Sequence, residues 1–386
     1  MTPFIAPGAT LGVMGGGQLG RMFVHAAQQM GYFTAVLDAD PTSPAGLVAH
    51  YHIETDYLDE QGLAQLMQRC AAITTEFENV PAKALVTLGA HRPVAPAAAA
   101  VAVCQDRAEE KSHFERSGVP CAPWARIETP ADVDAVAAAL LPGILKTARL
   151  GYDGKGQVRV ADRAALATAW AALKQVPCVL EKLLPLHREL SVVLARSANG
   201  AVVHLPVQQN LHRDGILAVT QAPAPDISAD LQAQAVRSAT EIAATLDYVG
   251  VLCIEFFVLD GGALVANEMA PRPHNSGHHS IDSCDVSQFE LQVRTMTGAP
   301  LVAPRQHSPC VMLNLLGDLW FRAGEREQAP DWAAVLALPG AHLHLYGKAT
   351  ARAGRKMGHL TVTAASADEA NAVALRAAAA LGIEAW

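Results

Sequence analysis

The sequence predicts an α/β protein that begins with a doubly wound parallel sheet and continues as a mixed α+β structure. Through the first hundred residues, short apolar segments alternate with helical stretches, which is the pattern of a parallel sheet with crossover helices. Further along, strand-like segments follow one another around glycine-rich turns, and the chain closes with a helical pattern. A chain of 386 residues has room for two or three domains. We therefore expect three parts, with boundaries at 1–107, 108–300 and 301–386.

The first part carries the clearest signals for individual elements. Strands are predicted at 11–14, 33–37 and 71–75, and a helix at about 18–30. The Pro- and Ala-rich stretch 93–103 is interpreted as a connection into a helix at 106–117, because proline interrupts both helices and sheets.

The second and third parts are rich in predicted strands. These lie at 144–147, 157–160, 178–182, 189–196, 201–207, 252–259, 263–267, 311–315, 341–346 and 359–363. Helices are expected at 164–175, 228–246 and 368–381.

Composition excludes several classes of protein. Charged residues make up 17% of the chain and hydrophobic residues 51%, whereas disordered proteins have low hydrophobicity and a high net charge. The net charge of −8 leaves no basic surplus to neutralise a nucleic-acid backbone. No apolar run reaches the roughly 18 residues of a membrane span, and no basic residue precedes Arg21, so no signal peptide is predicted. The seven cysteines are scattered, without a Cys-x-x-Cys pair. We expect a cytoplasmic protein with neither a nucleic-acid nor a membrane partner.

The first motif is Gly15-Gly16-Gly17-Gln18-Leu19-Gly20, which follows a predicted strand and opens a predicted helix. It fits the G-x-G-x-x-G dinucleotide fingerprint, with Asp38 about twenty residues further on. Taken alone it favours a nicotinamide-dependent dehydrogenase. The same glycines also suit any other anion at a helix N-terminus, and nothing downstream is typical of a dehydrogenase.

The second motif is a glycine-rich loop flanked by lysines. Lys146 lies on a predicted strand, and the loop 151–157 contains three glycines and Lys155. Such a backbone can close over phosphates while the two ammonium groups supply charge. An ordinary hairpin turn would not need two lysines in a chain that has only eight.

The third feature is a pair of carboxylates on a predicted hairpin. If Gly261-Gly262 forms a two-residue loop, Asp260 opposes Ala263, and Glu255 opposes Glu268. Carboxylates at opposed positions lie about 5 Å apart at Cβ and repel one another, and a bound cation relieves that repulsion. Oxygen ligands completed by nucleotide phosphates point to Mg²⁺, with Mn²⁺ as a substitute, and Asn267 adds a further oxygen. The alternative is a carboxyl group whose pKa is raised.

A polar loop follows the second glutamate. It contains Arg272, which can hold an anion through its guanidinium fork, and His274, His278 and His279. A zinc site is not favoured, because no acidic or cysteine partner stands at ligand spacing. We expect this loop to contact substrate.

Together these strings resemble the ATP-grasp enzymes, and among them the branch that carboxylates a purine-pathway ribonucleotide. The matching strings run in order from residue 12 to 359 and cover essentially the whole chain. They are 15–22, 75–81, 105–107, 151–157, 267–278 and 354–359. The resemblance implies a Rossmann-like N-terminal domain, an ATP-grasp domain and a small C-terminal domain. One departure is His279, where a larger aromatic or apolar residue is expected.

The resemblance also implies roles for individual residues. Those expected to bind ATP are Arg107, Lys146, Gly151, Tyr152, Asp153, Gly154, Lys155, Gly156, Gln157, Glu181, Lys182, Leu183, Leu184, Glu189, His212, Asn267 and Glu268. Those expected to bind bicarbonate or the ribonucleotide are Gly17, Gln18, Leu19, Glu76, Tyr152, Asp153, Lys155, Arg272, His274, Asn275, Lys348, Arg355 and Lys356. Lys155, Arg272 and Tyr152 are the expected catalytic residues, and Glu255 and Glu268 the expected Mg²⁺ ligands.

The implied reaction is the ATP-dependent carboxylation of 5-aminoimidazole ribonucleotide with bicarbonate in purine synthesis. It proceeds through carboxyphosphate and releases ADP and phosphate, and the implied assembly is a homodimer. Three alternatives stay open at this point: another ATP-grasp ligase or carboxylase, a dinucleotide-dependent oxidoreductase, and a nucleotide sensor without turnover.

Overall fold

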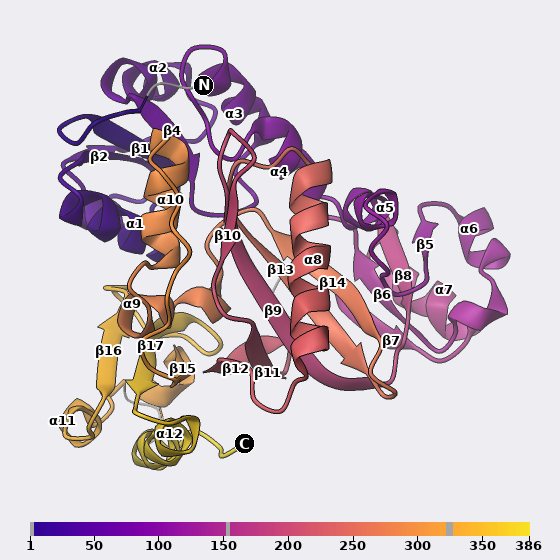
Figure 1. Ribbon diagram of the computed structural model, residues 1–386. Coiled ribbons are helices and arrows are strands. Elements are labelled where there is room, and N and C mark those ends of the chain that lie inside the picture. Colours follow the sequence, from indigo (N-terminus) through magenta and orange to yellow (C-terminus); the bar gives the residue numbers. More distant parts are fainter. Residues whose placement is uncertain (1–3, 152–154, 322–326) are drawn as a thin grey trace.

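The computed structural model describes residues 4–151, 155–321 and 327–386. Its N-terminal region is a parallel sheet of strand order β3-β2-β1-β4, built from β1 (Thr10–Met14), β2 (Phe33–Leu37), β3 (Tyr51–Ile53) and β4 (Ala72–Thr75). The helices α1 (Gln18–Gln29), α2 (Glu60–Arg69) and α3 (Ala82–Gly89) connect and cover these strands, with the short 3-10 helix η1 (Gly46–Val48) (Figure 1). The predicted α/β class and the parallel sheet are confirmed.

The interpretation of 93–103 as a simple connection is wrong in its second half. Val94 makes a single parallel bridge to Ile73, but residues Ala98–Cys104 form the helix α4. This helix begins only after Pro96, and its seven residues are alanine, valine and cysteine. Both prolines of this stretch thus precede the helix. The residues after them are mainly alanine, which has the highest helix propensity, and this explains why a helix forms there.

The central sheet of nine strands is antiparallel. Its order is β14-β13-β9-β11-β12-β15-β17-β16, with β10 (Val202–His204) paired to β9. Its first part consists of β9 (Leu186–Arg196), β11 (Gln208–Arg213), β12 (Ile216–Ala222), β13 (Gly250–Leu259) and β14 (Leu264–Ala270).

Strands β9 and β13 are buried on both faces, and alternate residues face different helices. The row that contains Val192 and Ile254 packs with residues of α8 (Ala229–Thr245). The opposite row, which contains Val193 and Cys253, packs with Leu291 of α10 (Gln288–Thr297). Burial of successive residues on opposite faces explains why these strands appear in the sequence as continuous apolar runs.

Helix α10 joins the central sheet to the N-terminal region. Phe289, Val293 and Met296 pack into the same core as Phe23 of α1, although more than 260 residues separate them in sequence. In Figure 1 the orange α10 stands beside the indigo α1 and β1. One helix thus fixes the N-terminal region against the sheet that carries the site.

A second, smaller sheet follows α5 along the chain. A four-stranded antiparallel sheet of order β5-β8-β6-β7 has its own apolar core with α6 and α7. Its elements, with the preceding helix, are α5 (Arg107–Arg116), β5 (Trp124–Ile127), α6 (Pro130–Ala135), η2 (Ala138–Leu140), β6 (Gly143–Thr147), β7 (Gln157–Val160), α7 (Arg163–Ala172) and β8 (Cys178–Lys182).

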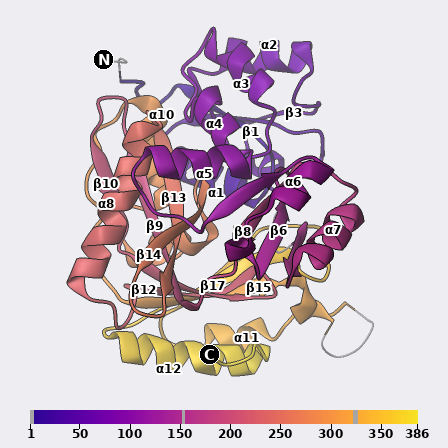
Figure 2. The ribbon, with the colours of Figure 1, turned by 90° about the vertical axis from the view of Figure 1, so that its right-hand side faces the viewer.

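The C-terminal segment extends the central sheet. Strand β15 pairs with β12, so 301–386 is continuous with the preceding region through a hydrogen-bonded ladder. Its elements are β15 (Cys310–Leu316), η4 (Gly317–Trp320), α11 (Trp332–Leu336), β16 (Ala341–Leu345), β17 (Lys356–Thr363) and α12 (Ala367–Leu381), and they follow the short η3 (Asn275–Gly277) and α9 (Ser280–Ser283). Figure 2 shows α11 and α12 below these strands, and α12 packs against one face of the sheet.

The packing of α10 gives a stability prediction. Phe289 is 1% exposed, so Phe289→Ala should lower the free energy of unfolding by about 3–5 kcal/mol through lost burial and a residual cavity. Urea unfolding followed by circular dichroism measures the change. Val302→Ala is the control, because Val302 is 53% exposed and its truncation should change stability by no more than about 0.5 kcal/mol. Equal effects of the two substitutions would contradict the structural role of α10.

Candidate active site

A cavity of about 710 Å³ lies between the small sheet and the β14 side of the central sheet. This volume falls in the usual range of small-molecule sites. Helix α5, strands β6 to β8 and strands β9, β11, β13 and β14 all contribute to its walls. The cavity therefore lies where three parts of the fold meet.

Most of the residues predicted from sequence line this one cavity. They are Arg107, Lys146, Gly151, Lys155, Gly156, Gln157, Glu181, Lys182, Leu183, Leu184, Glu189, His212, Glu255, Asn267, Glu268, Arg272, His274, Asn275 and Lys356. Tyr152, Asp153 and Gly154 lie outside the described residues. Gly17, Gln18, Leu19, Glu76, Lys348 and Arg355 are described but do not line it.

The two predicted metal-binding carboxylates are indeed opposed, although the predicted hairpin is wrong in detail. Glu255 pairs with Glu268 across β13 and β14, but Val258 pairs with Leu264, one residue out of the predicted register. The Leu259 amide donates to the Ala263 carbonyl at 2.8 Å, so the loop has three residues and Asp260 does not oppose Ala263. A β-bulge beside Glu255 then absorbs one residue and restores the predicted opposition.

The opposed carboxylates differ in their surroundings. Burial and the charge of Glu268 raise the pKa of Glu255 to about 7. Desolvation would also raise the pKa of Glu268, but the charges of Arg107 and Lys146 outweigh it and lower that pKa. Arg107 Nη1 lies 3.2 Å from Glu268 Oε2. Without a cation, the pair thus reduces its repulsion through one raised pKa and one arginine.

The lysine expected on the ATP phosphates is held by a buried carboxylate. Lys146 Nζ lies 3.0 Å from Glu181 Oε2, and Lys111 Nζ lies 3.2 Å from Glu181 Oε1. Burial alone would raise the pKa of Glu181, yet the charges of the two lysines lower it to about 2. Burial lowers the pKa of Lys146, and the charge of Glu181 opposes that change. The Glu181 side chain is therefore fixed by the two lysines, and its backbone lies in β8 between β5 and β6.

His212 and Glu189 form a second ion pair on neighbouring strands. His212 Nδ1 bonds to Glu189 Oε2, and its Nε2 lies 4.0 Å from Glu255 Oε1. Burial would lower the pKa of His212, but the hydrogen bond to Glu189 and the charge of Glu255 raise it to about 9. A cationic His212 therefore faces the carboxylate pair from β11.

The loop after β14 places a fixed cation and a neutral imidazole in the cavity. Arg272 donates through Nε to Glu78 Oε2 and through Nη1 to the Pro273 carbonyl at 3.1 Å. His274 Nε2 lies 3.5 Å from Glu255 Oε1. Burial and the charge of Arg272 lower the pKa of His274 well below its usual value, so its imidazole is neutral.

The glycine turn is occupied by the protein's own carboxylates. Glu76 accepts hydrogen bonds from the amides of Gly17 at 2.7 Å and Gly20 at 2.8 Å, and Asp38 accepts from Gly16 at 2.7 Å. Asp38 also accepts from the Tyr57 hydroxyl at 2.9 Å. Asp38, the carboxylate that would bind the ribose of a dinucleotide, thus bonds to the glycine turn itself.

The remaining predicted substrate residues lie on the loop before β17. Lys348 Nζ donates to the Lys356 carbonyl at 2.6 Å, and Arg355 Nη1 donates to the Thr350 carbonyl at 2.7 Å. A Cβ added at Gly347 would lie 3.2 Å from Nη1 of Arg21 on α1, so this loop packs against the N-terminal region. Of these lysines and arginines, Lys356 lines the cavity.

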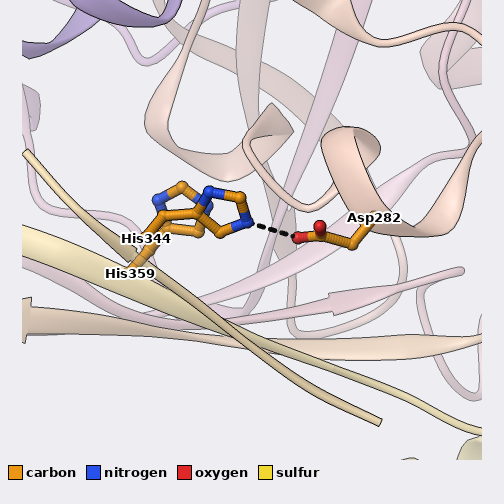
Figure 3. Close-up of side chains that lie close together, drawn as sticks. All are labelled: Asp282, His344 and His359. Carbon is orange, nitrogen blue, oxygen red and sulfur yellow. Dashed lines mark hydrogen bonds and ion pairs between the residues drawn. The ribbon is translucent and has the colours of Figure 1, made fainter.

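A histidine cluster beside the cavity has the composition of a metal site but not the geometry. Asp282, His344 and His359 bring their ligand atoms within 4.8 Å of one another (Figure 3). His344 Nε2 bonds to Asp282 Oδ2 at 2.9 Å, while the His344 and His359 rings are stacked 4.5 Å apart at an angle of 13°. Imidazole lone pairs lie in the ring plane, so one ion cannot lie in both planes of a stacked pair. The cluster ties β16 and β17 to α9.

Other buried histidines in this region are held in the same structural way. His278 Nδ1 lies 2.8 Å from Gln288 Nε2, and His279 Nδ1 lies 2.8 Å from Ser283 Oγ. Burial lowers the pKa of His279 to about 4, so it is a neutral hydrogen-bonding residue in the core.

Sequence reasoning missed several cavity residues. Strands β11 and β12 were not predicted, and their turn contributes Asp214 and Gly215 to the lining. Asp-Gly between two strands is a strong hairpin signal and could have identified them. Glu78 and Gln105 lie in the matched strings 75–81 and 105–107 but were given no role, and Glu110 carries no local motif because it reaches the cavity only through tertiary packing.

Family models match three consecutive stretches of the chain. The ribonucleotide synthetase preATP-grasp domain matches residues 8–105, the ATP-grasp domain residues 112–289, and the phosphoribosylaminoimidazole carboxylase C-terminal domain residues 310–373. The N5-carboxyaminoimidazole ribonucleotide synthase of Brucella melitensis is 45% identical over 360 residues, which is 92% of this chain and 97% of the relative. The chain belongs to the N5-carboxyaminoimidazole ribonucleotide synthase family.

Further members of the family agree in sequence and in structure. The Bacillus subtilis synthase is 38% identical over 95% of this chain and 94% of its own. An ADP complex of an N5-carboxyaminoimidazole ribonucleotide synthetase superposes with a TM-score of 0.90 at 37% identity, covering 99% of this chain and 98% of that one. The Aspergillus clavatus enzyme in complex with ADP and 5-aminoimidazole ribonucleotide gives 0.88 at 31% identity, covering 97% and 98%. In the described part of this synthase family member, no helix is long and apolar enough to cross a membrane.

The His212–Glu189 pair gives a pH prediction. Because folding raises the pKa of His212 from 6.5 to about 9, its stabilising contribution is complete below 6.5 and is lost as the pH rises through 9. His212→Gln should therefore destabilise the fold more at about pH 6 than at about pH 10. Urea unfolding of both proteins at the two pH values measures this, and an equal difference at both would contradict the pairing.

Proposed function

We propose that this chain catalyses the ATP-dependent carboxylation of 5-aminoimidazole ribonucleotide by bicarbonate. The products are N5-carboxyaminoimidazole ribonucleotide, ADP and phosphate. The observation that carries the proposal is the single cavity that joins the glycine loop, the opposed carboxylates and the polar loop 272–275. The relatives named above carry the name of this activity.

The ATP subsite is assigned to the part of the cavity between the two sheets. Leu183 and Leu184 line the cavity just beyond Glu181. Because the Leu183 amide donates to the Pro142 carbonyl at 3.0 Å, we assign the adenine edge to the Leu183 carbonyl and the Leu184 backbone. Glu189 supplies a carboxylate for the ribose hydroxyls. Lys146 and Arg107 are the cations available to the phosphates, and each is held by a carboxylate that the phosphates can replace as partner.

The residues present fit a Mg²⁺ ion. Glu255 Oε1 is buried and accepts no hydrogen bond within the described residues, and Glu268 stands opposite it. Together with Asn267 they form an all-oxygen donor set of the kind that Mg²⁺ prefers. When bound, the ion would supply positive charge to the nucleotide phosphates.

The chemistry proposed for the cavity needs positioned charge. A bicarbonate oxygen attacks the γ-phosphorus and the bond to the ADP oxygen breaks, giving carboxyphosphate. This species releases phosphate and CO₂, and the amine of the ribonucleotide attacks the CO₂ carbon and loses a proton. Lys146, Lys155 and Arg272 stabilise the transferring group, since positioning and electrostatics dominate phosphoryl transfer.

His274 suits the second half of the reaction. Its Nδ1 accepts a hydrogen bond from the Ser276 amide, so the neutral imidazole carries its proton on Nε2 and can donate a hydrogen bond to the substrate without adding charge. Enclosure of the site by the glycine loop would keep water from carboxyphosphate.

The ribonucleotide phosphate is assigned to the glycine turn at the N-terminus of α1, which lies outside the lining of the cavity. Glu76 takes the amides of Gly17 and Gly20, but those of Gln18 and Leu19 bond to no acceptor in the described part of the chain. Two open amides at a helix N-terminus favour an anion. Lys348, Arg355 and Lys356 would provide the balancing positive charge from the loop before β17.

The expected homodimer and the cytoplasmic location remain predictions. Gel filtration with light scattering tests the first, and fractionation of expressing cells tests the second.

The proposed function is tested by a coupled assay of ADP release. ADP should form at a high rate only when bicarbonate and 5-aminoimidazole ribonucleotide are both present, and ¹³C-bicarbonate should give a carbamate signal by NMR. Turnover with glycinamide ribonucleotide or biotin instead would favour another ATP-grasp reaction. NADH binding without ATP hydrolysis would favour an oxidoreductase.

The metal site gives a further prediction. Glu268→Gln keeps the size of the side chain but removes its charge, so ADP release should fall by about 100-fold or more. Circular dichroism should be unchanged. The control is Glu241→Gln on the exposed face of α8, which should retain full activity. Undiminished turnover of the Glu268 variant at ordinary Mg²⁺ would remove Glu268 from the metal site.

A further inference from the structure

Strand β14 is the edge strand of the central sheet, and its outer edge is held by the segment that begins with α5. The Ala266 amide donates to the Pro120 carbonyl at 2.7 Å. The Met269 amide donates to Glu110 Oε1 at 2.6 Å. The bulge that sets Glu268 opposite Glu255 lies between these two points.

Glu110 is buried, with 3% of its surface exposed, and lies one turn after Arg107 on α5. Positions three apart lie on the same helix face. Arg107 holds the side chain of Glu268, while Glu110 holds the backbone of the next residue. Two side chains on one face of α5 thus hold Glu268, one through its carboxylate and the other through the backbone amide that follows it.

We propose that Glu110 is a positioning residue whose side-chain oxygen fixes the β14 bulge and thereby keeps Glu268 opposite Glu255. This inference rests on the proposed function, in which that pair holds Mg²⁺. Glu110 acts through the Met269 amide and not by binding substrate. An oxygen at the reach of a glutamate side chain is required there, and a negative charge is not.

The electrostatics of the residue agree with this role. Burial, together with the charge of Glu268, raises the pKa of Glu110 to about 8, although the charges of Arg107 and Lys111 and the hydrogen bond from the Met269 amide oppose the shift. A group that is largely uncharged near neutrality is a weak metal ligand, but its carbonyl oxygen still accepts a hydrogen bond.

Two conservative substitutions of Glu110 separate the effect of its side-chain length from the effect of its negative charge. Glu110→Gln keeps the length and the acceptor oxygen but removes the charge. Glu110→Asp keeps the charge but shortens the side chain by one methylene, so it cannot reach the Met269 amide. Glu109→Asp, which changes a neighbouring residue bonded to Arg126 at the surface, is the matched control.

The first measurement uses the ligand-free protein. Hydrogen exchange of the Met269 amide is followed by NMR in protein labelled with ¹⁵N-methionine. Exchange in Glu110→Gln should stay within about 3-fold of the unchanged protein, whereas in Glu110→Asp it should be at least about 10-fold faster. Equal protection in both variants would overturn the proposal, whatever reaction the enzyme catalyses.

The second measurement is the Mg²⁺ dependence of ADP release. Glu110→Asp should raise the half-saturating Mg²⁺ concentration about 10-fold, with a smaller effect on the KM for bicarbonate, and Glu110→Gln should behave like the control. A Gln variant as impaired as the Asp variant, or more so, would assign the role to the charge and overturn the proposal. If the proposed reaction itself is wrong, no variant supports ADP release but the exchange result stands.

Discussion

The opposition of Glu255 and Glu268 is the constraint around which the rest of the site is arranged. Two carboxylates held across an antiparallel pair repel one another unless positive charge or a proton intervenes. In the described structure that compensation comes from Arg107, from the cationic His212 and from the raised pKa of Glu255. Each compensating group stands on a different element. The carboxylate pair therefore determines where α5 and β11 must lie relative to β13 and β14.

The other charged side chains of the cavity are likewise balanced by groups of opposite charge. Lys146, Lys111 and Glu181 form a buried cluster in which removal of any one member would leave an uncompensated charge. Such clusters contribute little net stability, because desolvation offsets much of the attraction. In this protein the cluster fixes the positions of the charged side chains. In the proposed ATP subsite, a phosphate would meet ammonium and guanidinium groups that the carboxylates already hold in position, and it would exchange one anionic partner for another.

Sequence reasoning found the cavity residues that lie in local motifs and missed those that tertiary packing supplies. The opposition of Glu255 and Glu268 was predicted correctly, but a three-residue loop and a bulge were needed where a two-residue loop was assumed. Strand β11 was not predicted because its buried positions are occupied by Gln208 and Asn210, which form hydrogen bonds with Ser191 in the interior. A strand that lines a polar site loses the alternation of apolar residues by which strands are recognised. Glu110 lacked any signal, since its partner is a backbone amide 159 residues away.

The glycine turn shows why the most visible motif was the least informative. Glycines at positions 15, 17 and 20 leave room for an anion at the start of α1, whatever that anion is. In this structure the side chain of Glu76, which directly follows β4, lies in part of that space and accepts hydrogen bonds from two of the amides. Less space is therefore left for a pyrophosphate. In the proposed ribonucleotide site, a smaller anion would use the two amides that remain. The space at the turn is thus limited by the Glu76 side chain, which lies 56 to 59 residues away in sequence and outside the motif.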